Sequence, residues 1–449
     1  MTGVGPGPWL RLTALAASAA TLLAVVSGAA HLGTAHRVLA ALAGPPLVAL
    51  LAAAWIAHRQ LLRPVLVAGL AFAAAAFVTS HDLHVAFASL AFAAALVAAA
   101  STFRDRSRDL DRGRSRDMAR DYVALTKPRI MSLLLLTGFC GMIVGARGWP
   151  GTGLAAAAMA GLALACGGAS ALNHVLDRDI DPLMGKRTAS RPVAAGRVAP
   201  SRALEFGLAL SAFSFVLLAS ATNVLTAVLA LVGNLFYVLV YTRWLKRTTP
   251  QNIVIGGAAG AVPPLVGWAA ATGNLTVPAL LLFLIVFFWT PPHFWALALL
   301  IREQYAAARV PMLPVVAPAR VVARKILLYS YAMVATTLAL APYAGWIYAA
   351  GAAGLGGWFL AEAHRLQTRV GQMGRAGRAP RPTETPAAAV PGGAGGATEG
   401  AGGVTEGACG GLARPGHPAP MRLFHLSIAY LSLLFALVAV TSILPLGRW

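Results

Sequence analysis

Apolar stretches of about twenty residues recur along this chain and are separated by short polar segments. A stretch of that length, wound as an α-helix, crosses the hydrocarbon layer of a membrane. The pattern predicts four spans before a hydrophilic break and nine after it. The first group covers residues 10–30, 37–57, 64–80 and 84–101, and the second covers 130–146, 153–173, 203–220, 223–242, 253–272, 277–300, 323–341, 344–362 and 422–445. We therefore predict an all-α, polytopic membrane protein.

Two polar segments divide this pattern. Residues 102–121 alternate Arg with Asp, which predicts a solvated, charged linker between two membrane units. Residues 371–420 are rich in Gly, Ala and Pro and contain almost no large apolar residue, which predicts a disordered loop. The expected domains are thus a four-helix transmembrane unit at 1–101, the linker, and a nine-helix domain at 122–449. We expect the first span to be an uncleaved helix, because three more spans follow it at once.

The placement of Lys and Arg predicts the orientation of the chain. The loops at 102–129, 177–202, 243–247 and 302–325 carry 23 basic residues, whereas the alternate loops carry only Arg147. By the positive-inside rule the first set faces the cytoplasm, in a cell inner membrane. The formal charge of +21 then reflects topology and phosphate binding, and we exclude nucleic acid as a partner. The scattered cysteines Cys140, Cys166 and Cys409 suggest neither a disulfide framework nor a zinc site.

The most informative motif follows the span at 153–173. Asn173, Asp177 and Asp181 are spaced i, i+4, i+8, so on a helix they would lie along one face. Carboxylates at the mouth of a membrane helix repel each other unless a cation lies between them, and such oxygen ligands suit Mg²⁺ with the phosphates of a substrate. The basic residues of the following loop would bind those phosphates: they are Lys186, Arg187, Arg191 and Arg197. The alternative is a snorkelling, positive-inside loop with incidental acids.

This motif, with "KRTASRPVAAGRV" after it, resembles the first aspartate motif of the UbiA-type membrane prenyltransferases. Further segments are similar to the protohaem farnesyltransferase branch of that family: "YVALTKPRIMSLLLLTG" (122–138), "YTRWLKRTTPQNIVIGGAAGAVPPLVGWAAATG" (241–273), "PPHFWALALL" (291–300) and "VPMLPVV" (310–316). The resemblance covers about residues 120–365 and 421–446. It implies a nine-helix bundle that transfers a farnesyl group from farnesyl diphosphate to a vinyl group of protohaem IX, with Mg²⁺.

The resemblance also implies roles for residues in three cytoplasmic corners. In the first, Asn173, Asp177 and Asp181 would hold the metal and the diphosphate, helped by Lys186, Arg187 and Arg191. In the second, the family usually has an Asp before the Tyr that precedes "PMLPVV". This chain has Glu303-Gln304-Tyr305 there, so Glu303 either takes over with a longer arm or is a plain surface acid. In the third, Tyr241, Lys246 and Arg247 would bind substrate, although a positive-inside anchor explains the two basic residues equally well.

His293 lies on an apolar span among Phe294 and Trp295. It is expected either to approach the porphyrin or to be a hydrogen-bonded core histidine.

The first hundred residues weakly resemble one four-helix half of haem A synthase. The segments that carry this resemblance are "HRVLAALAGPPLVALLAAAW" (36–55) and "LHVAFASLAFAAAL" (83–96). It implies that His36 and His84 ligate one haem b iron from neighbouring helices, near the outer membrane face. The alternative is that these histidines are interfacial polar residues.

Three readings of the whole chain remain open at this point. The leading one is a haem-modifying farnesyltransferase that serves terminal oxidases, with membrane lipid around it and haem A synthase or oxidase assembly factors as partners. A second is a UbiA-type prenyltransferase with a quinone or another aromatic acceptor. A third is a non-catalytic haem-handling assembly protein.

Overall fold

The computed structural model describes residues 8–29, 34–56, 61–77, parts of 87–102, 118–376 and 418–444. In these residues the chain is helical and has no strand. Eight of the helices are long and apolar enough to span a membrane. The predicted all-α, polytopic membrane protein is therefore confirmed.

The N-terminal unit contains α1 (Pro8–Ala29), α2 (Thr34–Ile56) and α3 (Leu62–Phe77). The fourth predicted span is described only at some positions between 87 and 99, and these are helical. These helices share a core of their own, built mostly from Leu and Ala, such as Leu10, Leu50 and Leu61. A second apolar cluster joins Val25 of this unit to Phe215 of α9 (Pro200–Ala221).

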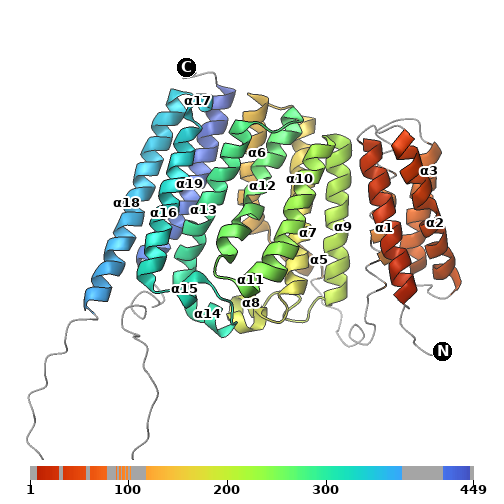
Figure 1. Ribbon diagram of the computed structural model, residues 1–449, viewed down its shortest axis with the longest axis horizontal. Coiled ribbons are helices and arrows are strands. Elements are labelled where there is room, and N and C mark those ends of the chain that lie inside the picture. Colours follow the sequence, from red (N-terminus) through yellow and green to blue (C-terminus); the bar gives the residue numbers. More distant parts are fainter. Residues whose placement is uncertain are drawn as a thin grey trace, which may run out of the picture.

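The larger domain begins with the short α5 (Met118–Leu125). Its long helices are α6 (Pro128–Ala146), α7 (Thr152–Leu176), α9, α10 (Val224–Leu235), α12 (Asn252–Thr272), α13 (Val277–Leu300), α16 (Ala319–Ala339), α18 (Trp346–Ala376) and α19 (Pro418–Ile443). They lie side by side in Figure 1, from α9 at one edge to α18 at the other. The short helices α8 (Lys186–Ala189), α14 (Arg302–Ala307) and α15 (Leu313–Val316) gather at one end, and α17 (Ala341–Ala344) lies at the other.

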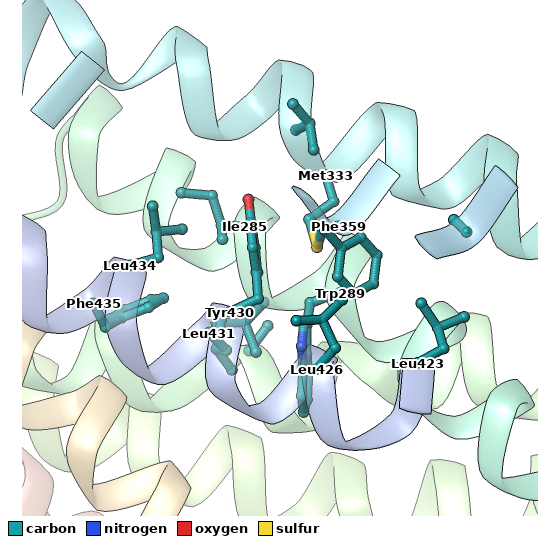
Figure 2. Close-up of a cluster of buried hydrophobic side chains, with 14 of the residues drawn as sticks. Ile285, Trp289, Met333, Phe359, Leu423, Leu426, Tyr430, Leu431, Leu434 and Phe435 are labelled. Atoms are coloured by element: carbon teal, nitrogen blue, oxygen red, sulfur yellow. The ribbon is translucent and has the colours of Figure 1, made fainter. Parts of the chain in front are cut away.

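A large apolar core holds α13, α16, α18 and α19 together (Figure 2). Its members include Ile285, Trp289, Met333, Phe359, Leu426 and Tyr430. The indole of Trp289 donates a hydrogen bond of 2.7 Å to the carbonyl of Ser427, so this polar atom is satisfied inside the core.

Glycines let α6 and α12 approach closely. A Cβ atom on Gly267 would collide with the carbonyl oxygen of Gly138, and one on Gly141 would collide with the backbone of Pro264. Small residues at such crossings are typical of membrane helices, where close van der Waals packing replaces the hydrophobic effect as the force between helices.

Within the described residues helices lie at the predicted spans, but only eight of the thirteen are long and apolar enough to cross a membrane. The described N-terminal helices have shorter apolar stretches, and α18, expected at 344–362, is not among the eight. The helix expected to end near 362 continues to Ala376, so the first residues assigned to the loop at 371–420 are helical. The reason is its pattern: Leu366 and Val370 are buried against the core while the positions between them are polar, so the extension is amphipathic rather than uniformly apolar. The rest of the predicted loop, up to residue 417, lies outside the described residues, as does most of the linker at 102–121.

Candidate active site

The Asn173 motif lies where α7 ends. The three motif residues were expected on one face of a single helix, but α7 stops at Leu176. A short turn follows, and then a 3₁₀-helix, η3 (Asp181–Met184). The spacing is nevertheless kept, because the Asp177 amide donates to the Asn173 carbonyl and the Asp181 amide to the Asp177 carbonyl, each at 2.9 Å. All three side chains are buried, with Asp177 and Asp181 at 0% exposure. Buried carboxylates need cations nearby, and the loops around α7 supply them.

Lys246 is the principal partner of Asp177. Its ammonium donates to Asp177 Oδ2 at 2.6 Å, and the amide of Asn173 donates to the same oxygen at 2.8 Å. Lys246 follows a π-helix, η4 (Phe236–Leu245), which continues α10 and places the lysine beneath the end of α7. The other oxygen, Asp177 Oδ1, is buried and accepts no hydrogen bond among the described residues.

Asp181 repeats this arrangement with Arg191. The guanidinium donates to Asp181 Oδ1 at 2.6 Å, while Asp181 Oδ2 is buried and has no hydrogen-bond partner among the described residues. Burial raises the pKa of Asp181, and the Arg191 guanidinium opposes that rise. Two carboxylates thus each keep one oxygen that a further cation could bind.

Lys127 completes the site, and the sequence had given no reason to single it out. It precedes Pro128 at the start of α6, with a left-handed backbone (φ 51°). Its ammonium donates to Asn173 Oδ1 at 2.7 Å, which turns the Asn173 amide nitrogen toward Asp177. Burial, followed by repulsion from Arg191, lowers the pKa of Lys127 to about 7. The signal in the sequence is a lone lysine at the mouth of a span, which a positive-inside anchor explains as well.

Arg247 and Asp179 form a pair at the rim. The guanidinium makes two hydrogen bonds to the Asp179 carboxylate, at 2.6 and 2.7 Å, and one to the carbonyl of Leu176. These bonds lower the pKa of Asp179 to about 2. The Asp179 side chain is 58% exposed and lies off the buried motif.

The remaining predicted residues of the 186–197 loop lie farther out. Lys186 and Arg187 are exposed at the start of α8. Arg197 pairs instead with Asp121 of α5, at 2.9 Å. Of these four loop cations, Arg191 and Arg197 have ion-pair partners within the described part of the chain.

The second corner meets the first through α14. Glu303 and Gln304 are both exposed, and Gln304 lies against Gly185, the residue between η3 and α8. Tyr305 packs on Ile180 and Met184 in a small apolar cluster. The position at which the family usually has an Asp is thus the one that touches the motif loop.

Tyr241 and His293 lie in apolar surroundings. Tyr241, in η4, stacks on Tyr237 with ring centroids 5.5 Å apart. His293 stacks between Trp289 and Phe424, and its Nδ1 shares a 2.7 Å hydrogen bond with Ser427. This environment is that of a hydrogen-bonded core histidine.

Two more buried polar side chains near the motif were missed from the sequence. Both ring nitrogens of His174 and both side-chain polar atoms of Asn252 are buried without a hydrogen-bond partner in the described residues. Each sits in or next to an apolar span, where a single polar residue has no recognisable spacing. In the N-terminal unit, His36 lies in the first turns of α2, and His84 lies outside the described residues.

Taken together, the site contains two buried carboxylates, Asp177 and Asp181, a buried lysine, Lys246, and two half-buried cationic side chains, Lys127 and Arg191. Its net charge favours an anion. No group of three or more His, Cys, Asp and Glu side chains able to hold a metal occurs among the described residues. A divalent cation here would therefore need ligands from water and from the anion itself.

Comparison with known proteins adds to this geometry. The UbiA prenyltransferase family model matches residues 134–376. The chain is 46% identical over 326 residues to a protoheme IX farnesyltransferase of Frankia alni, covering 72% of this chain and 98% of the relative. It is 57% identical over 244 residues to a protoheme IX farnesyltransferase of Symbiobacterium thermophilum, covering 54% of this chain and 79% of the relative. The solved structure of a digeranylgeranylglyceryl phosphate synthase has the same fold, with a TM-score of 0.53 and 14% identity over 72% of this chain and 98% of that one.

Proposed function

This chain belongs to the UbiA prenyltransferase family, in its protohaem IX farnesyltransferase branch, and we propose that it forms haem O from protohaem IX and farnesyl diphosphate. It is a prenyltransferase. The observation that carries the proposal is the pair of buried carboxylates, Asp177 and Asp181, beside three cations. Each carboxylate has one oxygen that accepts no hydrogen bond from the described residues, and Asp177 Oδ1 lies 4.0 Å from the Arg247 guanidinium. A solvated positive-inside loop would not bury these acids.

The residues present fit Mg²⁺, and we propose that activity depends on it. Asp177 Oδ1 and Asp181 Oδ2 are the two oxygens that would hold the ion, because both are buried and lack a donor among the described residues. Asn173 fits less directly, since its Oδ1 already accepts from Lys127. When bound, Mg²⁺ would supply charge stabilisation to the diphosphate leaving group.

In the proposed reaction the cationic side chains bind the diphosphate. Lys246 and Arg191 donate to the two carboxylates at 2.6 Å, and Lys127 donates to Asn173 at 2.7 Å. Because these cations are already held in place, little reorganisation is needed when negative charge develops on the diphosphate. The bond between farnesyl C1 and oxygen breaks, and its electron pair leaves with the diphosphate. A vinyl carbon of protohaem bonds to C1, water adds to the resulting cation, and one proton is released.

The apolar wall around Tyr237 and Tyr241 would protect the allylic cation. These stacked rings belong to the same π-helix that leads to Lys246, so they continue from the charged end of the site toward the bundle interior. Aromatic faces stabilise a carbocation electrostatically and exclude water that would quench it.

We place this site at the cytoplasmic face of a cell inner membrane, on the strength of the Lys and Arg distribution. The three cations of the site, Lys127, Arg191 and Lys246, all come from loops or helix ends rather than from the middle of a span. Haem A synthase and oxidase assembly factors remain the proposed partners, because they would receive the product.

For the N-terminal unit, we propose a separate domain at residues 1–101 that ligates haem b through His36 and His84. The full-length protein, reconstituted with haem without farnesyl diphosphate, should then show a low-spin bis-imidazole spectrum. Replacing either histidine with Ala should remove that component, since one axial ligand cannot maintain it. An identical spectrum in both variants would reduce this unit to an anchor.

The proposed function is tested by expression in a host that supplies farnesyl diphosphate but lacks a haem O synthase. Extracted haems should contain haem O with the wild-type chain and none with Asp181→Ala. A prenylated quinone or other prenylated aromatic product, without haem O, would show that such a compound is the acceptor instead of protohaem. Unchanged haem b and no released diphosphate would favour a non-catalytic role.

A further inference from the structure

A pocket of about 360 Å³ lies between α18 and α19, at the edge of the bundle opposite α9. Its polar wall consists of Glu362 and Arg365 from α18 and Arg422 and His425 from α19. Its apolar wall consists of Trp358, Leu426 and Ala429. None of these residues belongs to the site around Asp177, so the pocket has no part in the proposed chemistry.

The charges of this pocket favour an anion. Glu362 is 5% exposed and accepts a 3.1 Å hydrogen bond from Arg365, so its carboxylate is already neutralised. Arg422 and His425 are exposed and have no ion-pair partner among the described residues. One arginine and one imidazole are therefore available to a ligand, and Arg365 can share its other nitrogen atoms.

The pocket also lies at the depth of lipid headgroups. Glu362 is sixteen residues from the start of α18 and Arg422 twenty-one from the end of α19, which correspond to about 24 and 32 Å along the helices. The hydrocarbon layer is about 30 Å thick, so Arg422 reaches its boundary and the paired Glu362 lies about one helical turn inside it. Trp358 is 51% exposed on the same helix face, one turn nearer the start of α18 than Glu362, so it lies at the depth of the acyl chains.

From these observations we infer that the groove between α18 and α19 binds one anionic phospholipid. Its phosphate accepts hydrogen bonds from Arg422, His425 and Arg365, and an acyl chain lies along Leu426, Ala429 and Trp358. The polar wall lies toward the membrane surface and the apolar wall toward its interior, because Ala429 is two turns of α19 farther from the surface than Arg422. This is the order of the headgroup and the acyl chain in a phospholipid. A Mg²⁺-bound prenyl diphosphate fits this pocket less well, because its one carboxylate, on Glu362, is paired with Arg365.

The test is native mass spectrometry of the full-length protein released from bilayers of equal parts phosphatidylglycerol and phosphatidylcholine. The wild type should retain one phosphatidylglycerol in preference to phosphatidylcholine. Arg422→Gln should lower that retention about fivefold, the effect of one interfacial cation, whereas Arg422→Lys should keep it. Arg202→Gln, an exposed arginine in the first turn of α9, is the matched control and should change nothing.

A second variant separates a lipid from a free anion. Ala429→Phe fills the apolar wall and leaves the cations in place, so it should reduce phosphatidylglycerol retention as well. Equal retention in the wild type and Arg422→Gln would overturn the inference. So would equal retention of the two lipids, or displacement of the lipid by stoichiometric farnesyl diphosphate or by inorganic phosphate. Arg365 is left untouched, because its removal would strand the buried Glu362.

Discussion

Replacing Asp177 with Asn changes one atom and should nearly abolish prenyl transfer. The Asn side chain keeps the shape of the carboxylate but removes its charge, leaving Lys246 at 7% exposure without a counter-ion. Breaking a buried pair of this kind costs about 3–5 kcal/mol of stability. Loss of one prearranged electrostatic contact lowers kcat by about 10²–10³-fold, or roughly 3–4 kcal/mol in the transition state.

Asp179→Asn is the matched control, two residues away in the same loop. Asp179 is also bonded to an arginine, but its side chain is 58% exposed and that of Arg247 is 27% exposed. Exposed pairs contribute about 0–1 kcal/mol, so kcat should fall by less than about fivefold. The two substitutions differ little in chemistry and strongly in burial.

Both variants are assayed after reconstitution in vesicles, with haem O quantified by chromatography at saturating farnesyl diphosphate. Thermal unfolding of the same samples shows whether the Asp177 variant is folded under assay conditions. If both variants are folded and Asp177→Asn forms haem O at a rate similar to that of Asp179→Asn, the buried carboxylate of Asp177 has no role in the reaction.

Three further substitutions probe the surroundings of the site. Lys127→Met removes the hydrogen bond to Asn173 and should raise KM for farnesyl diphosphate about 10–100-fold while protohaem binding is kept; unchanged kinetics would make Lys127 an anchor. Gln304→Asp restores the family's usual acid and should be tolerated, with higher activity at limiting Mg²⁺; complete loss would show that the glutamine has its own role. Gly267→Ala should destabilise the α6–α12 crossing by about 1–3 kcal/mol in thermal unfolding, while Gly260→Ala, where a Cβ has open space, should not; equal melting temperatures would contradict the close approach.

The spans could be predicted well because hydrophobic length is a local property. The segment expected at 277–300 is α13, Val277–Leu300, to the residue. The extension of α18 was missed because an amphipathic helix beyond the hydrocarbon layer does not show the uniform apolarity of a span.

The candidate site was predictable in part. Spacing alone placed Asn173, Asp177 and Asp181 together, because i, i+4 contacts are local. The partners come from elsewhere: Lys246 is 69 residues from Asp177, and Lys127 is 46 residues from Asn173. Such pairings depend on how the helices pack, and a basic residue at the mouth of a span looks the same whether it binds a carboxylate or anchors the chain.

We propose that the buried carboxylates and the cations beside them ionise farnesyl diphosphate for transfer to protohaem. The most direct test of this proposal measures diphosphate release and haem O formation together, with the purified full-length protein in vesicles. We expect one diphosphate per haem O, no release without Mg²⁺, and loss of both products in Asp177→Asn. Release of diphosphate without haem O, or haem O formed at the wild-type rate by Asp177→Asn, would contradict the proposal.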